Sequence, residues 1–370
     1  MTDKNLIFLI SQPRSGSTLT QKLLGTHSEI YTRSEPWIML NPLYQLKKDG
    51  VYAEYNKLWE FAATEDFIVN LPNGGKQNHI KHLNKMYLSL YNEYLKKEDR
   101  SYFLDKTPRY YLVINELIEV FPKAKYILLL RNPLAVLGSI ASSWTKENWY
   151  MLSNYKVDLI DGVDALLDAS NNHKNSIHTF QYEDLLNNQI DTLEEIFKYI
   201  GLSFEKEVLK YNQKKSEKWL YGDPQNVYEK EGIDISNDSK WVKGLDNPQY
   251  WRIMHDYLQY IGKDKFELLG YDFNHNLEIL KQNIPCKTID ELEAKTFSLL
   301  SLLNDTRECL IKNQQLAQQI NMKNQELENK KNIIQKQGLE IQAIYSSKKY
   351  KFANTLAYPY IILEKFIKDK

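Results

Sequence analysis

A short polar turn with several groups able to bind an anion follows the first apolar run of the chain. Residues 6–10 are all apolar, and they lead into Gln12-Pro13-Arg14-Ser15-Gly16-Ser17-Thr18-Leu19. Leucines at positions 19, 23 and 24 then recur with helical spacing, so a helix is expected to begin just after the glycine. The first backbone N–H groups of a helix bind anions, and nearby hydroxyl and guanidinium groups add further donors. The segment therefore predicts a phosphate-binding turn with the candidate ligands Arg14, Ser15, Gly16, Ser17 and Thr18.

This turn differs from the Walker A sequence of ATP- and GTP-binding proteins. Walker A reads Gly-x-x-x-x-Gly-Lys-Ser/Thr, whereas here Ser17 stands in the place of the lysine and no glycine precedes Gly16 at the required distance. A second apolar run, residues 126–130, ends in Arg131 where a Walker B strand would present an aspartate to magnesium. Both differences disfavour a P-loop kinase-like phosphotransferase, which remains an alternative.

The second apolar run leads into another candidate anion site. Pro133 is a favoured first residue of a helix, and Ser139 follows Arg131 by eight residues, or just over two helical turns. The guanidinium and the hydroxyl together are suited to a second phosphate group. Helix capping by the Arg-Asn-Pro turn would explain the same residues, so this signal is weaker than the first.

Both turns require a sheet that brings the ends of distant strands together. Up to about residue 275, short apolar runs alternate with longer amphipathic stretches, which predicts parallel strands connected by helices. In such sheets ligands bind at the carboxyl ends of the strands, where both turns are expected. The predicted fold is a three-layer α/β domain over residues 1–280, with a P-loop-like parallel sheet flanked by helices.

The two motifs together resemble the sulfotransferase family, in particular the tyrosylprotein sulfotransferase branch and its bacterial relatives. The resemblance rests on Pro-Arg-Ser-Gly-Ser-Thr paired with Phe-Pro-Lys-Ala-Lys-Tyr-Ile-Leu-Leu-Leu-Arg-Asn-Pro-Leu-Ala-Val-Leu-Gly-Ser, and it covers roughly residues 5–275. It implies use of 3′-phosphoadenosine 5′-phosphosulfate (PAPS) as cosubstrate, release of 3′-phosphoadenosine 5′-phosphate (PAP), and no metal requirement. The first motif would bind the 5′-phosphosulfate, and Arg131 and Ser139 would bind the 3′-phosphate.

The same resemblance implies roles for further residues. Asp105-Lys106-Thr107-Pro108 stands where the family has a catalytic lysine, which would neutralise charge on the departing PAP, while Arg14 would stabilise the transferring sulfuryl group. Glu35, in Thr-Arg-Ser-Glu-Pro-Trp, stands where the protein-tyrosine branch carries its general base, although a helix first-turn role is an alternative. Tyr182, in Gln-Tyr-Glu-Asp-Leu, and Lys240, in Ser-Lys-Trp, would contact the nucleotide.

The expected activity is therefore transfer of a sulfuryl group from PAPS to a hydroxyl of a glycan, a glycolipid or a protein tyrosine. The motifs are specific for the donor nucleotide and say little about this acceptor. A scaffold protein, with a vestigial nucleotide fold and a functional coiled coil, is a second alternative.

The composition restricts the partners and the compartment. Lys and Arg number 48 and Asp and Glu number 48, so the net charge favours no nucleic acid partner. The two cysteines are too few for a disulfide framework and are compatible with a reducing compartment. The first residues form no signal peptide and no run reaches membrane-spanning length, so a cytoplasmic enzyme is expected.

The last quarter of the chain has a different character. Residues 287–345 nearly lack Gly and Pro, and Ile320, Leu327, Ile334 and Ile341 recur every seven residues, which predicts a coiled coil that forms a homodimer or docks an assembly partner. A long helix packed on its own domain and a partly ordered linker are the alternatives. Residues 346–370 carry lysines interleaved with aromatic residues, which predicts a tail that contacts a membrane surface or docks as a terminal helix.

Overall fold

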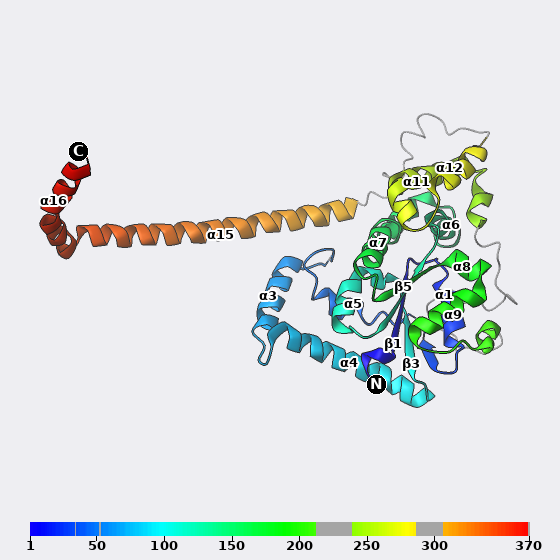
Figure 1. Ribbon diagram of the computed structural model, residues 1–370. Helices are drawn as coiled ribbons and strands as arrows, with labels where there is room; N and C mark the ends of the chain where they lie inside the picture. Colours follow the sequence, from blue (N-terminus) through cyan, green and yellow to red (C-terminus); the bar gives the residue numbers. More distant parts are fainter. Residues whose placement is uncertain (34, 52, 212–238, 286–305, 369–370) are drawn as a thin grey trace. The chain divides into compact units, whose positions relative to one another are not determined.

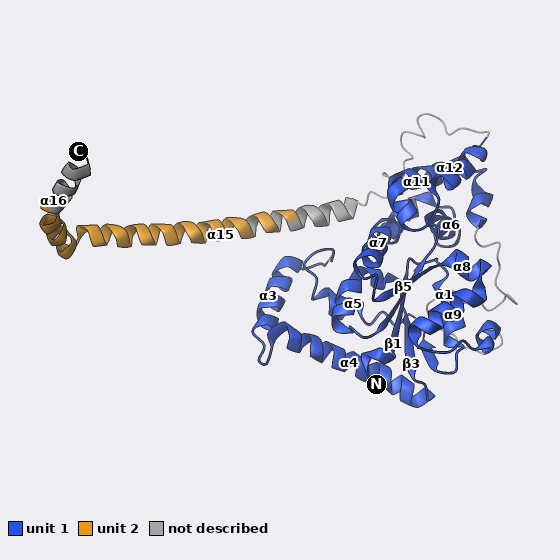
Figure 2. Ribbon diagram, in the orientation of Figure 1, with its two compact units in different colours: residues 1–306 blue, residues 307–370 orange. Residues whose placement is uncertain are grey.

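The computed structural model describes residues 1–33, 35–51, 53–211, 239–285 and 306–368. It divides into two compact units, Met1–Thr306 and Arg307–Lys370, which Figure 2 shows in different colours.

The first unit is built on a parallel sheet of five strands in the order β2-β3-β1-β4-β5. The strands span Leu6–Ser11 (β1), Ile30–Arg33 (β2), Tyr102–Lys106 (β3), Lys125–Leu130 (β4) and Ile177–Gln181 (β5). The central strand β1 is buried along its whole length, and β4 is buried except at its first residue. Continuous apolar runs form such strands because a parallel sheet is covered on both faces. The predicted strands at residues 6–10 and 126–130 are confirmed.

Helices cover both faces of the sheet, as Figure 1 shows. Side chains alternate along β1, so that Ile7 and Leu9 pack with α1, α8 and α9, whereas Phe8 and Ile10 pack with helices of the opposite layer. The three-layer α/β prediction is confirmed. The helices of this unit span Ser17–Gly25 (α1), Leu40–Tyr44 (α2), Lys57–Val69 (α3), Gly75–Glu98 (α4), Ile114–Val120 (α5), Pro133–Ser143 (α6), Gly162–Asn172 (α7), Tyr182–Asn187 (α8), Gln189–Ile200 (α9), Pro248–Leu268 (α11) and Phe273–Gln282 (α12).

The order of the strands creates a topological switch point beyond the carboxyl ends of β1 and β4, a region that we call the crevice. The chain leaves β1 for β2 on one side of the sheet, and it leaves β4 for β5 on the other. The two connections therefore diverge between β1 and β4, which are neighbours, with Ser11 in register with Leu129. Ligands of open α/β sheets bind at this kind of switch point, beyond the carboxyl ends of the strands.

The second unit consists of two helices, Thr306–Ser346 (α15) and Lys348–Lys368 (α16). In α15 the heptad residues Ile320, Leu327, Ile334 and Ile341 are 53–67% exposed. The predicted long helix is thus present over residues 306–346, while residues 287–305 of that prediction lie outside the described part of the chain. The coiled coil itself remains a prediction. No helix among the described residues is long and apolar enough to span a membrane.

Candidate active site

The carboxyl edge of the sheet collects nearly all of the residues singled out from the sequence. Each strand contributes a segment directly after its last residues, because all five strands run parallel. The contributions are Arg14 to Thr18 after β1, Glu35 after β2, Lys106 at the end of β3, Arg131 after β4 and Tyr182 after β5. Residues that are distant in sequence are thereby placed around the crevice between β1 and β4.

The turn after β1 has the backbone shape of an anion-binding loop. Arg14 and Gly16 both adopt left-handed conformations, with φ of +68° and +94°, and Gly16 caps the N-terminus of α1. Ser17 and Thr18 are the first two residues of the helix, so their N–H groups have no partner within the helix. The hydroxyl of Ser15 is buried and makes no hydrogen bond to any described residue. A buried polar atom of this kind is costly unless a ligand pairs with it, so the turn fits a phosphate or sulfate group.

Gly16 is required for a second reason. A Cβ atom at this position would lie 2.3 Å from Cε2 of Tyr182, far inside van der Waals contact. Tyr182 is buried, and its ring lies 4.6 Å from the guanidinium carbon of Arg131. The phenol therefore packs between the glycine of the turn and the arginine that follows β4.

The two predicted anion sites are in direct contact with each other. Nη1 of Arg131 donates a hydrogen bond to the carbonyl oxygen of Arg14 at 2.7 Å, and Nε of Arg14 donates to Oγ of Ser139 at 3.1 Å. Burial lowers the pKa of Arg131, although Tyr182 and Glu183 act in the opposite direction. Two arginines in one crevice repel each other, so an anion bound between them would relieve that repulsion.

Ser139 is positioned by a well-capped helix. Asn132 caps α6 through a hydrogen bond from the N–H of Leu134 to Oδ1 at 3.0 Å, and Pro133 is its first residue, as predicted. Lys240 begins a short 3-10 helix, Lys240–Gly244 (η7), and is exposed. Its neighbour Trp241 packs against Gly138, the residue before Ser139. Lys240 is therefore held on a segment that lies against the helix carrying Ser139.

Glu35 and Lys106 form an ion pair at the edge of the site. The Lys106 side chain is fully buried and Glu35 is 16% exposed, and Nζ lies 2.7 Å from Oε1. The other carboxylate oxygen, Oε2, accepts a hydrogen bond from Nε1 of Trp37 at 3.2 Å. A carboxylate and an ammonium side by side offer a proton acceptor and a positive charge in one place, two groups that can assist a group transfer.

A second carboxylate lies directly before the lysine but is completely buried. Asp105 accepts hydrogen bonds from the hydroxyls of Tyr91 at 2.6 Å, Tyr110 at 3.2 Å and Thr107 at 2.8 Å. Burial raises the pKa of Asp105 to about 6, although these hydrogen bonds act to lower it. The network anchors the end of β3 and so holds the backbone from which Lys106 projects.

Some residues of this edge were not predicted. Arg109 forms two hydrogen bonds to the buried carboxylate of Asp158, from Nε to Oδ1 at 2.7 Å and from Nη2 to Oδ2 at 2.6 Å. Arg109 follows Lys106-Thr107-Pro108, so its place just after a strand was a usable signal. Asp158 lies in a short π-helix, Val157–Asp161 (η4), which has no comparable sequence signal. Trp37 stands two residues after the predicted Glu35, in the same Thr-Arg-Ser-Glu-Pro-Trp segment. His27 packs against Phe197 away from these groups, and its Nε2 lies 3.0 Å from the carbonyl oxygen of Ser203.

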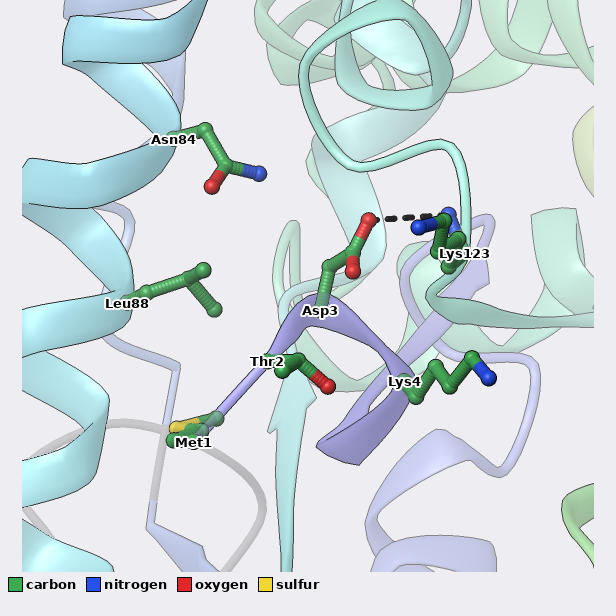
Figure 3. A pocket seen from close by; sticks show the side chains of 7 residues that line it. All are labelled: Met1, Thr2, Asp3, Lys4, Asn84, Leu88 and Lys123. Carbon is green, nitrogen blue, oxygen red and sulfur yellow. Dashed lines mark hydrogen bonds between the residues drawn. The ribbon is translucent and has the colours of Figure 1, made fainter.

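A separate pocket lies at the opposite edge of the sheet. It is lined by the first four residues, by Asn84 and Leu88 of α4 and by Lys123 (Figure 3). Asp3 accepts a hydrogen bond from the N–H of Lys123 at 3.0 Å. The pocket is next to the amino end of β1 and shares no residue with the crevice. Among the described residues there is no cluster of three or more His, Cys, Asp or Glu side chains that could hold a metal ion.

Comparison with known proteins identifies a family and two relatives. A family model described as "Sulfotransferase family" matches residues 6–206, which is more than half of the chain. "Nodulation protein NoeE" of Sinorhizobium fredii is 35% identical over 139 residues, which cover 38% of this chain and 32% of that protein. An uncharacterized protein of Aquifex aeolicus is 25% identical over 219 residues, covering 57% of this chain and 27% of that protein. The chain thus matches about a third or less of the length of these relatives.

Two solved structures illustrate the structural comparison. The "Sulfotransferase Domain from the Synechococcus PCC 7002 Olefin Synthase" is 22% identical with a TM-score of 0.43, covering 65% of this chain and 88% of that chain. Mouse sulfotransferase SULT7A1, whose structure is complexed with PAP, is 14% identical with a TM-score of 0.42, covering 73% of this chain and 89% of that chain.

Proposed function

Because the chain belongs to the sulfotransferase family, we propose that it transfers a sulfuryl group from PAPS to a hydroxyl of a glycan, a glycolipid or a protein tyrosine, releasing PAP. One observation carries the proposal. An anion-binding turn that contains Arg14, a second arginine bonded to that turn, and an ion-paired carboxylate and lysine all meet at the carboxyl edge of one sheet. Bound PAPS would supply the sulfuryl group.

The residues divide into two groups by what they can do. The turn offers N–H groups, the Ser15 hydroxyl and Arg14 to an anionic group. Arg131 and Ser139 are the candidates for the 3′-phosphate. Tyr182, whose ring contacts Arg131, and Lys240, on the segment that packs against α6, are candidates for further contacts with the nucleotide. On the other side of the crevice, Glu35 is the candidate base that accepts the proton of the acceptor hydroxyl. A positioned base of this kind contributes on the order of 10²–10⁴-fold to the rate.

Lys106 has two proposed roles, first in the ion pair with Glu35 and then in stabilising charge on the leaving group. While Lys106 is bonded to Glu35, its ammonium group holds the carboxylate in place at the carboxyl edge of the sheet. When the carboxylate takes up a proton it loses its charge, and the lysine can then stabilise negative charge that develops on the leaving group. Transfer of a charged group through a loose transition state depends mainly on such positioning and charge stabilisation.

The first test is calorimetric titration of the full chain with PAP, AMP and ATP. We expect PAP to bind at least tenfold more tightly than AMP or ATP, and Ser139→Ala and Arg131→Lys to reduce that preference. Ser142→Ala, on the exposed part of the same helix, is the matched control and should behave as the wild type. Tighter binding of ATP that requires magnesium would support the kinase-like alternative, and absence of nucleotide binding would support the scaffold alternative.

A second step identifies the acceptor. Sulfur-labelled PAPS is offered with a chitin oligosaccharide, a glycolipid and a tyrosine peptide with flanking acidic residues. Transfer to one of them supports the proposed function. A protein that binds PAP and labels none of the three would contradict the acceptor classes named here.

We also propose a cytoplasmic enzyme whose C-terminal helices provide its partner contacts. The exposed heptad of α15 supports a homodimer, since a seven-residue repeat on one helix is complementary to a second copy of itself. The lysines and aromatic residues of α16 support contact with an anionic membrane surface.

A further inference from the structure

A cluster of two tryptophans and two arginines connects Arg14 of the anion-binding turn to Trp144, Arg109 and Trp37, three residues with none of the roles assigned above. Trp37 follows β2, Arg109 lies in the 3-10 helix Pro108–Val113 (η2) after β3, and Trp144 is the C-cap residue of α6. The guanidinium carbon of Arg109 lies 5.2 Å from the ring centroid of Trp37 and 6.0 Å from that of Trp144. The guanidinium carbon of Arg14 lies 5.7 Å from the same Trp144 ring. One indole is therefore shared by the arginine of the anion-binding turn and by Arg109.

Arg109 is held in place by a buried carboxylate. Both of its hydrogen bonds go to Asp158, whose carboxylate is buried and also accepts a hydrogen bond from the Tyr111 hydroxyl at 2.7 Å. Burial acts to lower the pKa of Arg109, but its hydrogen bonds and the charge of Asp158 outweigh this, so the pKa is raised. The backbone carbonyl of Asp158 in turn accepts a hydrogen bond from Nε2 of Gln12, two residues before Arg14, at 2.8 Å. The guanidinium of Arg109 is therefore held in place by Asp158, whose backbone is in turn bonded to Gln12, just before the anion-binding turn.

Trp37 is the link from Arg109 to the candidate base. Its φ of +58° lies in the left-handed region, which is sterically unfavourable for a bulky side chain. Two contacts support this conformation, the guanidinium of Arg109 on the ring and the hydrogen bond from Nε1 to Oε2 of Glu35. A strained backbone conformation of this kind persists only where surrounding contacts hold it in place. Here that conformation points the indole N–H of Trp37 at the carboxylate of Glu35.

Trp144 is the link from Arg109 to the anion-binding turn. Its ring also packs against Tyr155, with centroids 5.0 Å apart, so its position is fixed independently of the arginines. Arg14 is held by this ring and by its hydrogen bond to Ser139. The contacts form an unbroken chain from Arg14 through Trp144, Arg109 and Trp37 to Glu35.

We propose that Trp144 and Arg109 are positioning residues that set the distance between Arg14, on the donor side, and Glu35, on the acceptor side. This inference rests on the proposed function, because only a transfer between the two sides makes their separation important. In-line transfer aligns the attacking and leaving oxygens, and a misplacement of about 1 Å can cost on the order of 100-fold in rate. Neither residue is assigned contact with a substrate, so nucleotide affinity should not depend on them.

The test compares Arg109→Lys and Trp144→Leu with the wild type, using the acceptor that the wild type labels. Lysine keeps the charge of Arg109 but cannot form the paired bonds or lie flat on an indole. We expect kcat to fall about 10- to 100-fold in each variant, while KM for PAPS and Kd for PAP change less than about threefold. Trp144→Phe, which keeps an aromatic face, should recover part of the lost kcat.

Matched controls come from α11. Arg252→Lys alters an arginine whose Nε lies 3.0 Å from Oδ2 of Asp256, and Trp251→Leu removes a half-buried indole. Both should leave kcat within about twofold of the wild type, and thermal unfolding of all variants shows whether each is folded. Unchanged kcat in folded Arg109→Lys and Trp144→Leu would overturn the inference, as would a parallel loss of PAP affinity, which would make them nucleotide ligands.

The proposed function fails in a different way. A wild-type chain that binds PAP but transfers no sulfuryl group to any acceptor would contradict that function. If the wild-type chain and the Arg109→Lys and Trp144→Leu variants all transfer the sulfuryl group at the same rate, only the positioning role is contradicted.

Discussion

Nζ of Lys106 lies 2.7 Å from Oε1 of Glu35, although 71 residues separate the two in the chain. The pair forms because β2 and β3 are neighbours in the sheet, with Arg33 in register with Asp105. Breaking a buried ion pair leaves an uncompensated charge, whereas replacing both partners with neutral groups costs much less. Comparing single and double substitutions of the pair therefore distinguishes its contribution to stability from its contribution to catalysis.

We expect Glu35→Gln to lower kcat by roughly 10²–10⁴-fold and to destabilise the protein by a few kcal/mol. The double variant Glu35→Gln/Lys106→Met should regain most of the stability but none of the activity. Urea unfolding and labelled-PAPS transfer measure the two effects. A double variant as unstable as Glu35→Gln would show that the buried lysine charge is not the cause of the loss.

Gly16→Ala should reduce PAP affinity at least tenfold. The new methyl group meets the Tyr182 ring at 2.3 Å, so the turn or the tyrosine must move, and φ at this position is +94°. Gly201→Ala is the control, because Gly201 has φ of +98° and nothing within 4 Å of its added Cβ. Both variants carry the cost of a left-handed alanine, and calorimetry should find PAP binding impaired only at Gly16. Equal affinities in the two variants would argue against contact between the turn and the nucleotide.

Asp105 should make the protein less stable as the pH rises from about 4 to 6. Its pKa is about 6 in the folded state and 3.8 in the reference state, so the folded protein binds more protons in this range. The free energy of unfolding then falls with rising pH, by roughly 3 kcal/mol in total. Asp105→Asn removes this titration.

The difference between Asp105→Asn and the wild type should therefore change across that pH range and be constant above about pH 7. Asp246→Asn, at an exposed position, should follow the wild type at each pH. Urea unfolding at half-unit intervals of pH measures the difference. A difference that does not vary with pH would contradict the raised pKa.

Leu327→Glu and Ile334→Glu in the full chain should shift sedimentation from dimer to monomer. These two residues are 56% and 67% exposed and lie on the predicted seam of α15. Leu339 is 61% exposed but lies off the seven-residue repeat, so Leu339→Glu should leave the dimer intact. Wild-type sedimentation as a monomer at micromolar concentration would contradict the homodimer proposal.

Phe352→Ser/Leu356→Ser should weaken binding to vesicles that contain phosphatidylserine. Both residues are 68% exposed and lie four positions apart on one face of α16, near Lys348 and Lys351. We expect wild-type binding to fall with added salt and to be weak on phosphatidylcholine vesicles, since part of the attraction is electrostatic. Ala353→Ser is the control. Flotation that is equal for the wild type and the double variant would exclude this face from membrane contact.

Much of the architecture could be predicted from local patterns. The runs at residues 6–10 and 126–130 formed the expected strands because continuous apolar segments bounded by Gly and Pro turns are buried on both faces of a parallel sheet. Helix α6 begins at Pro133, and a long helix covers residues 306–346, as predicted. Both could be predicted because the residues that start or favour a helix act on neighbours within one or two turns. The residue types of the anion-binding turn, and the family that they indicate, could also be recognised from the sequence.

Contacts between distant segments were not predictable in this way. No periodicity places Tyr182 against Gly16, Asp158 under Arg109, or Trp144 between two arginines. Those contacts follow from the strand order β2-β3-β1-β4-β5, which is a result of packing over the whole domain. The sequence by itself determined which groups are available and how each local turn is shaped, since both depend on neighbouring residues. Only the tertiary structure decided which of these groups meet, because that depends on which strands lie side by side.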